Sequence, residues 1–324
     1  MGKEKIYNDF LSLNFNRINE KQKLRARNYI IDSLMEMYKI NIIHGKYFKC
    51  KIFSHNCYNL ESNNNNYQIL LTAHYDTHGY RQNYIQSYLL RKLLSNKFMC
   101  SLIVLLLALI IFRFSIILKN FPKICSFLIL TIIFLLYKLL FWGFPLCLKF
   151  SSNSFNPAPI HDDNNSGVIA LIYIAKLLYE KGHSNKIKLL FTDCEEKGML
   201  GSKLFIKNNF KNLKNKIIIN LDCVGRGSNI FITSKNNSKL AKKLQCFFLL
   251  KNINTTLSTK SCSDDKSFQE FGFDSVGIIR GDKDPHENKL IHWTHTPHDT
   301  LDNINICYVT EIIELVTKFI ENNL

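Results

Sequence analysis

The chain of 324 residues is long enough for one large α/β domain or two small ones. Its hydrophobic share of 46% is that of a folded protein and excludes a disordered one. Basic residues outnumber acidic ones by 42 to 26, which gives a formal net charge of +16. The lysines are dispersed, and no basic patch interleaved with aromatic residues stands out. The charge therefore predicts no binding of nucleic acid.

The N-terminal part of the chain predicts a helix followed by two strands. Residues 18–38 carry apolar side chains at helical spacing with charged ones between them, which indicates an amphipathic helix. Residues 41–53 are typical of a strand, and we expect polar loop residues after them. Residues 67–73 are nearly all apolar or β-prone, as in a strand at the centre of a sheet, and they lead directly into His74.

Two long apolar segments interrupt the globular pattern. Residues 98–118 are 21 residues with a single charge, and residues 124–148 are 25 residues with a single charge. Each segment could cross the roughly 30 Å hydrocarbon layer as a helix. A pair of buried core helices is the alternative, but the first segment has no polar face to turn toward water. We therefore predict that residues 98–148 form an inserted membrane hairpin, spanning or re-entrant, with the lipid bilayer as its partner.

Strands and helices alternate again after this insertion. Residues 186–192 and 216–221 predict strands, and residues 167–180 and 202–209 predict helices. Such alternation predicts an α/β fold, a three-layer sandwich with a mixed, mostly parallel central sheet, interrupted by the inserted hydrophobic helical hairpin. Its domain would consist of residues 1–97 and 149–324.

Acidic and histidine residues stand at the points where predicted strands end. His74 and Asp76 follow the strand over residues 67–73, Glu195 and Glu196 follow residues 186–192, and Asp222 follows residues 216–221. Ligand sites of open α/β sheets form at such strand ends. Singly, each residue has an ordinary structural explanation, and the DDNNSG stretch alone would be a helix cap. Their joint occurrence, in order, predicts a site.

The motifs around these residues resemble those of the zinc-dependent aminopeptidases, a family that also includes the glutaminyl cyclases. The matching pieces are AHYDT (73–77), DNNSG (163–167), CEEKGMLGS (194–202), NLDCVG (220–225) and HTPHDT (295–300), with a weaker match at SDDKSF (263–268). The resemblance covers most of the chain outside the apolar hairpin. It departs from the family between the first two motifs, where His74 and Asp163 are 89 residues apart.

The resemblance implies a site with two Zn²⁺ ions and assigns a role to each residue. The metal ligands would be His74 and Asp222 on one ion, Glu196 and His295 on the other, and Asp163 bridging both. Glu195 would be the general base, and Asp76 would orient His74. The weaker motif would supply the substrate-binding residues Asp264, Asp265 and Phe268. Asp299, four residues after His295, is a candidate for orienting a site histidine.

Elementary chemistry agrees with this assignment. Zinc accepts imidazole nitrogen and carboxylate oxygen, and two ions close together need a bridging carboxylate. Asp163, Asp222, Glu196 and a bound hydroxide would offset the four positive charges of two ions, as a partly buried site requires. The implied function is an aminopeptidase that hydrolyses the N-terminal residues of peptides through a metal-bridging hydroxide, with Glu195 moving the proton.

Two other functions stay open at this stage. A glutaminyl-peptide cyclotransferase would use the same metal site, and a catalytically inactive, membrane-anchored binding module would keep the fold. The second alternative is disfavoured because all five ligands and Glu195 are present. The oligomeric state stays open as well.

The expected location is a membrane, with the catalytic domain on the cytoplasmic side. More basic residues flank the apolar hairpin than lie in its connector, which favours this orientation. The first residues of the chain lack the apolar core of a signal peptide, and its ten cysteines show no CxxC pair. Both features favour a reducing compartment.

Overall fold

The computed structural model describes residues 2–48, 54–78, 162–235, 238–259, 263–283, 290–291, 294 and 299–324. All of these belong to one compact unit, Met1–Tyr80 together with Pro157–Leu324. The predicted hairpin over residues 98–148 lies outside the described residues. Within the described ranges, no helix combines the length and apolar character that a membrane crossing needs.

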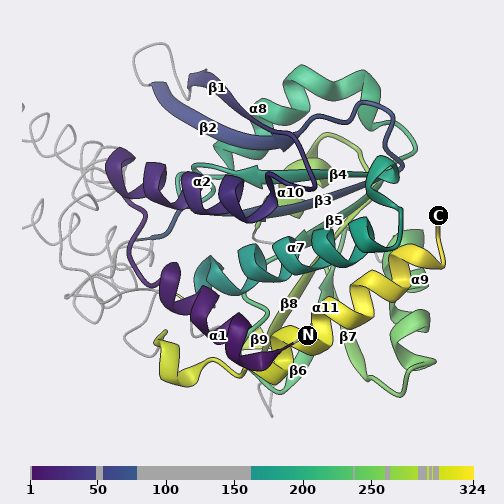
Figure 1. The fold of residues 1–324 in the computed structure, drawn as a ribbon. Helices are drawn as coiled ribbons and strands as arrows, with labels where there is room; N and C mark the ends of the chain where they lie inside the picture. Colours follow the sequence, from purple (N-terminus) through teal and green to yellow (C-terminus); the bar gives the residue numbers. More distant parts are fainter. Residues whose placement is uncertain are drawn as a thin grey trace, which may run out of the picture. The chain divides into compact units, whose positions relative to one another are not determined.

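A mixed sheet forms the centre of this unit, in the strand order β1-β2-β4-β3-β5-β8-β6-β7, and β9 pairs with β8. The strands are β1 (Ile40–Phe48), β2 (Ser54–Ser62), β3 (Ile69–His74), β4 (Ile187–Thr192), β5 (Ile217–Leu221), β6 (Asn229–Thr233), β7 (Thr255–Ser258), β8 (Ser275–Lys283) and β9 (Leu290–Ile291). The helices are α1 (Lys3–Ser12), α2 (Glu20–Leu34), α7 (Asp162–Glu180), α8 (Leu200–Asn209), α9 (Lys239–Leu249), α10 (Asp264–Glu270) and α11 (Ile306–Glu321). Figure 1 shows α7 and α11 lying side by side along the sheet.

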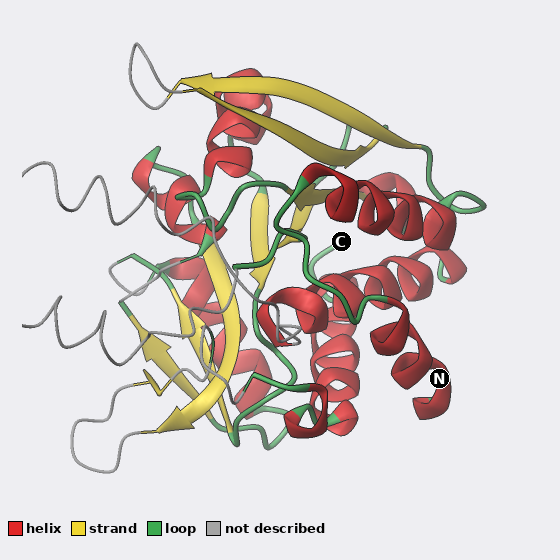
Figure 2. Ribbon diagram, turned by 90° about the vertical axis from the view of Figure 1, so that its left-hand side faces the viewer, coloured by secondary structure: helices red, strands yellow, loops and turns green. Residues whose placement is uncertain are grey.

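The parallel pairing at the centre of the sheet matters most for function. β3 pairs in parallel with both β4 and β5, and β5 pairs in parallel with β8. Among the described strands, four pairings are parallel and four are antiparallel, so the mixed sheet is confirmed but is not mostly parallel. The antiparallel pairings include the long β1–β2 ribbon, which Figure 2 shows at one edge of the sheet.

Apolar side chains of the central strands alternate between the two faces of the sheet, because successive residues of a strand point to opposite sides. Leu71, Leu189 and Ile219 belong to the larger core, which also holds side chains of α1, α2, α7, α9 and α11. Leu70, Leu190 and Ile218 belong to a second core with residues of α8 and α10. Helices on both faces of one sheet make the three layers that the sequence predicts.

Two predictions about the chain before residue 67 need correction, and both concern strands. The predicted strand over residues 41–53 is β1, which the structure describes as ending at Phe48. The residues after it, expected to be a polar loop, include strand β2. Hydrophobicity alone misses β2 because several of its buried side chains are polar. Asn59 is only 1% exposed, and its amide binds the backbone of Asp193 and Gly201.

Tyr67 gives a prediction about stability at alkaline pH. Its side chain is 2% exposed, and its hydroxyl has no hydrogen-bond partner among the described residues. Burial, with a contribution from the Glu61 carboxylate, raises the pKa of Tyr67 to about 12. Between pH 10 and 12 the unfolded chain therefore releases a proton that the folded chain keeps, and the free energy of unfolding falls as pH rises.

Tyr67→Phe removes this proton. Relative to wild type, the variant should gain about 1.4 kcal/mol in free energy of unfolding between pH 8 and pH 11, since one pKa unit corresponds to about 1.4 kcal/mol. Urea titrations at both pH values measure the difference. Tyr7→Phe, which removes a hydroxyl from a side chain that is 44% exposed, controls for the substitution itself. A difference that is the same at both pH values would contradict the prediction.

Candidate metal centre

Three of the predicted metal ligands meet at the carboxyl ends of the central strands. His74 is the last residue of β3, Asp222 directly follows β5, and Asp163 lies at the start of α7. Because β3 and β5 run in parallel, their carboxyl ends lie at the same edge of the sheet. This edge is where open α/β sheets form their ligand sites.

The three side chains form a buried cluster that could hold a metal ion. His74 Nε2 lies 3.2 Å from Asp163 Oδ1 and 3.4 Å from Asp222 Oδ1. One donor atom from each residue lies within 4.8 Å of the other two. The residues are 1%, 5% and 8% exposed in chain order. An imidazole nitrogen with two carboxylate oxygens is a donor set that suits a zinc ion.

The orientation of His74 is set by Asp76. His74 Nδ1 lies 3.1 Å from the Asp76 backbone oxygen and 3.7 Å from its Oδ1. An imidazole that donates from Nδ1 keeps Nε2 free to bind a metal. Burial works against protonation of His74, but the neighbouring carboxylates of Asp222, Asp163 and Asp76 outweigh it and raise the pKa of the imidazole well above its usual value. The site therefore attracts positive charge strongly.

Glu195 is tied to the same aspartate. Its backbone N–H donates to Asp76 Oδ1 at 3.0 Å, so one carboxylate contacts both a predicted ligand and the predicted base. Removal from water raises the pKa of Glu195 well above its usual value. The charges of Glu196, Asp264 and Asp222 add to this rise, and His74 opposes it. A carboxylate whose pKa is raised is better suited to take up a proton near neutral pH.

The other two predicted ligands are Glu196 and His295. Glu196 directly follows Glu195 and is not one of the three residues of the cluster. His295 lies outside the described residues. The assignment of a second metal ion to these two side chains therefore stays a prediction.

Asn164, the residue after Asp163 in the DDNNSG stretch, fixes the start of α7 against the end of β5. Asn164 Oδ1 accepts hydrogen bonds from the backbone N–H groups of Gly167 and Cys223, at 2.9 and 3.1 Å, and its Nδ2 donates to the Leu221 carbonyl at 2.9 Å. Asn164 thus caps α7 and joins it to the end of β5. A Cβ at Gly167 would lie 2.4 Å from the Leu221 oxygen, so only glycine allows this approach.

Asp299 holds the other side of the stretch. Its Oδ1 accepts from the Asp162 N–H at 2.8 Å, and its Oδ2 accepts from the Asp163 N–H at 3.4 Å. Burial and the charge of Asp299 raise the pKa of Asp162 to about 8. The structure therefore shows Asp299 positioning the backbone of the predicted bridging ligand. The prediction that Asp299 orients a site histidine stays a prediction, because His295 lies outside the described residues.

Asp299→Asn should weaken metal binding without unfolding the chain. The amide group turns an N–H donor toward one of the two backbone N–H groups, which frees the segment that carries Asp163. Changes of this kind beside metal ligands lower affinity roughly 10–100-fold. Competition between the protein and a chromophoric chelator for Zn²⁺ measures the effect. Asp302→Asn, at an exposed position, is the control, and equal affinity in both variants would refute the role of Asp299.

The three predicted substrate-binding residues lie in the interior of the described structure, and their contact with a substrate stays a prediction. Phe268 is fully buried and packs edge-on against Phe205 in the second core. Asp265 accepts a hydrogen bond from the Thr233 hydroxyl at 2.7 Å, and Asp264 accepts one from the Thr192 hydroxyl. All three have an exposed fraction of 0%. The motif that suggested them stabilises α10 against the sheet.

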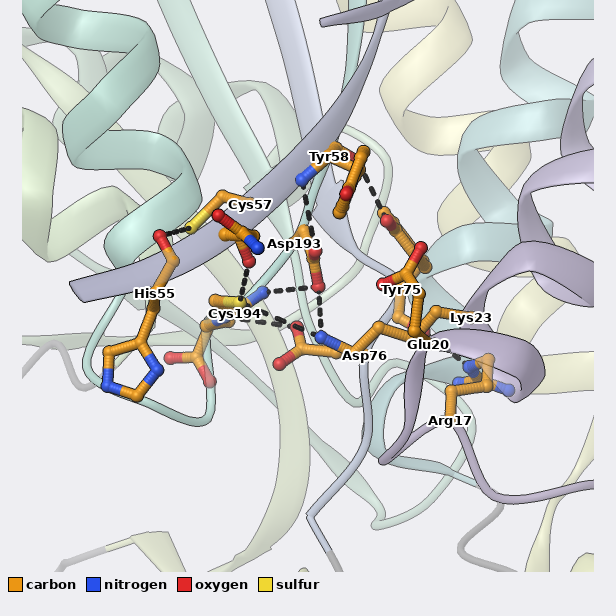
Figure 3. Close-up of polar contacts among 12 residues, drawn as sticks. Arg17, Glu20, Lys23, His55, Cys57, Tyr58, Tyr75, Asp76, Asp193 and Cys194 are labelled. Atoms are coloured by element: carbon orange, nitrogen blue, oxygen red, sulfur yellow. Dashed lines mark hydrogen bonds and ion pairs between the residues drawn. The ribbon is translucent and has the colours of Figure 1, made fainter. Parts of the chain in front are cut away.

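Sequence reasoning missed the charged residues behind the cluster. Figure 3 shows Lys23 of α2 reaching Asp193, close to Asp76 and Cys194. Arg17, just before α2, is 1% exposed, and its side chain donates to the backbone oxygen of Tyr75, between His74 and Asp76. One signal was available: Lys23 occupies the apolar stripe of α2, in line with Ala26, Ile30 and Leu34, where a charge needs a buried partner.

The comparisons with known proteins agree with this fold. The family model of peptidase family M28 matches residues 154–320. The curated aminopeptidase YwaD of Bacillus subtilis is 28% identical over 174 residues, which are 49% of this chain and 37% of YwaD. The chain therefore belongs to peptidase family M28, and the resemblance found in its motifs is confirmed. It spans well under half the length of that curated relative.

Two solved structures share the fold. The glutaminyl cyclase of Porphyromonas gingivalis has a TM-score of 0.65 at 16% identity, with 100% of this chain and 99% of that chain covered. The LapA aminopeptidase of Legionella pneumophila has a TM-score of 0.60 at 12% identity, with 98% and 70% covered. At these identities the likeness is one of fold.

Proposed function

We propose that the chain is a zinc aminopeptidase that removes N-terminal residues from peptides. The observation that carries the proposal is the buried cluster of His74, Asp163 and Asp222, with the backbone of Glu195 tethered beside it through Asp76. Membership of peptidase family M28 and likeness to proteins named as aminopeptidases, YwaD and LapA, support it.

The proposed cofactor is Zn²⁺, with two ions per chain. His74 and Asp222 would hold one ion, Glu196 and His295 the other, and Asp163 both. Bound zinc supplies a polarised carbonyl and a water of lowered pKa. The donor atoms of the first three residues fit such an ion, because they converge from one histidine and two carboxylates in a site closed to bulk water.

Glu195 would carry the proton during hydrolysis. Its carboxylate would take a proton from the attacking water and pass it to the nitrogen of the leaving amine, so that the peptide bond breaks without a charged amide leaving group. The raised pKa of Glu195 suits the first half of this transfer, in which the carboxylate takes up the proton. Asp76 would keep the base and His74 in a fixed relation, since its carboxylate contacts both residues.

A glutaminyl cyclase is the second candidate function. The likeness to the Porphyromonas gingivalis glutaminyl cyclase spans nearly the full length of both chains, which favours it. In such an enzyme the α-amino group of an N-terminal glutamine would attack the carbonyl of its own side-chain amide, which forms a ring and releases ammonia. It would not release a free amino acid.

The two activities are separated by their products. The full chain is purified in detergent and offered aminoacyl chromogenic amides and N-terminal glutaminyl peptides, each with and without a chelator. The aminopeptidase proposal expects chelator-sensitive release of the N-terminal residue. Release of ammonia from glutaminyl peptides, with no amino acid released from any peptide, would establish the cyclase instead.

We also propose that residues 98–148 hold the enzyme on a bilayer, with the catalytic domain facing the cytoplasm. The support is the pair of long apolar segments and the basic residues that flank them. The insertion lies in sequence between two predicted metal ligands, His74 and Asp163, so it would keep the active site close to the membrane. Protease added outside sealed, right-side-out vesicles should leave the catalytic domain intact. Cleavage of the domain would show that it faces the other side of the membrane.

A further inference from the structure

Lys23 is a buried lysine far from the metal cluster in sequence. The residue is 4% exposed, although it belongs to the surface helix α2. Its Nζ lies 2.5 Å from Asp193 Oδ1 and 3.6 Å from Cys194 Sγ. A buried ammonium group is costly unless a carboxylate compensates it, and Asp193, with an exposed fraction of 0%, does so.

Asp193 uses both of its carboxylate oxygens to hold the turn that follows β4. Oδ1 accepts from the Cys194 N–H at 2.8 Å as well as from Lys23, and Oδ2 accepts from the Tyr58 N–H at 3.0 Å. Cys194 has a φ of 58°, a left-handed conformation that non-glycine residues adopt at some cost. The hydrogen bonds to Asp193 offset this cost and set the direction in which the chain continues to Glu195.

The same ammonium group also lies beside Asp76. Asp76 is 2% exposed, and its Oδ1 accepts a hydrogen bond from the Glu195 backbone N–H at 3.0 Å, so it is joined to the same turn. Figure 3 shows the Lys23 side chain next to both Asp193 and Asp76. Without a cation here, two buried carboxylates would repel each other directly behind the site.

We propose that the Lys23–Asp193 ion pair is a positioning device for catalysis, which holds the turn carrying Glu195 and the aspartate that orients His74 in a fixed relation. The inference rests on the proposed function, because it concerns the placement of its general base. Lys23 and Asp193 are positioning residues: neither is a member of the metal-binding cluster.

The test compares Lys23→Met and Asp193→Asn with a matched control, Lys188→Met. Lys188 is also buried, and its Nζ lies 3.6 Å from Glu61 Oε2 near the opposite end of β4. Full-length variants in detergent are assayed for kcat and KM on an aminoacyl chromogenic amide, for bound zinc, and for hydrogen exchange over residues 193–196. Lys23→Met should keep its zinc, lower kcat about 10–100-fold with KM within about twofold, and speed exchange of the Cys194 and Glu195 amides.

The double variant should lose no more than the worse single variant, because both changes break one pair. Lys23→Arg, which keeps the charge, should recover part of kcat. Equal losses in Lys23→Met and Lys188→Met, or unchanged exchange over residues 193–196, would overturn the proposal. If Lys23→Met fails to fold, Lys23→Arg and Asp193→Asn decide by the same measurements. A wild-type chain without turnover would refute the proposed function, while the exchange data would still decide the role of the pair.

Discussion

Glu195→Gln should reduce turnover about 10²–10⁴-fold while leaving the zinc content unchanged. The amide has the shape of the carboxylate but cannot take a proton from water, and general-base catalysis typically contributes a factor of this size. The loss corresponds to about 3–5 kcal/mol in the activation free energy. Glu195 is not one of the residues of the cluster that would hold the first ion, so metal binding should survive. Steady-state kinetics and metal analysis of the same preparation measure both quantities.

Glu314→Gln is the control, because it makes the same chemical change at an exposed position of α11. Its kcat should equal that of wild type. Full activity of Glu195→Gln would show that another group accepts the proton. Loss of zinc from Glu195→Gln would show that Glu195 binds metal instead.

Asp163→Ala should lose the metal and, with it, all chelator-sensitive activity. Asp163 contributes one of the three donors of the buried cluster and is the carboxylate assigned to both ions. Residues that merely orient a ligand cost roughly 10–100-fold in metal affinity when they are changed, so removal of a shared ligand should cost more. Equilibrium dialysis against Zn²⁺ followed by metal analysis measures the number of ions that remain bound per chain.

Asp302→Ala, at an exposed position, is the corresponding control. Asp163→Ala and Asp299→Asn also form a graded pair, since the first removes a ligand and the second only loosens the backbone that presents it. Wild-type zinc content and affinity in Asp163→Ala would show that Asp163 is not a metal ligand.

The central strands and their polar ends could be predicted because local sequence determines them. The apolar runs of β3, β4 and β5 are typical of central strands, which are buried on both faces of a sheet. His74, Glu195 and Asp222 stand at or shortly after the ends of such runs, so parallel pairing brings them to one edge. The cap at Asn164 and the close approach at Gly167 are likewise local, and the DDNNSG stretch indicates both.

The residues that could not be predicted depend on partners far away in sequence. Lys23 and Asp193 are 170 positions apart, and nothing near either residue shows that they meet. Strand β2 was missed for the same reason, because Asn59 is buried only by virtue of its bonds to Asp193 and Gly201. Phe268 was assigned to substrate binding from its motif, but the motif does not show its packing against Phe205 of another helix.

Zinc titration of the metal-free chain tests whether the release of N-terminal residues depends on two bound ions. The full chain is freed of metal with a chelator, returned to detergent buffer, and titrated with Zn²⁺ while the release of N-terminal residues from a panel of peptides is followed. We expect no release without metal, and release that rises with added Zn²⁺ and saturates at two ions per chain. Metal-loaded protein that releases no N-terminal residue from any peptide, or release that is equally fast without metal, would contradict this expectation.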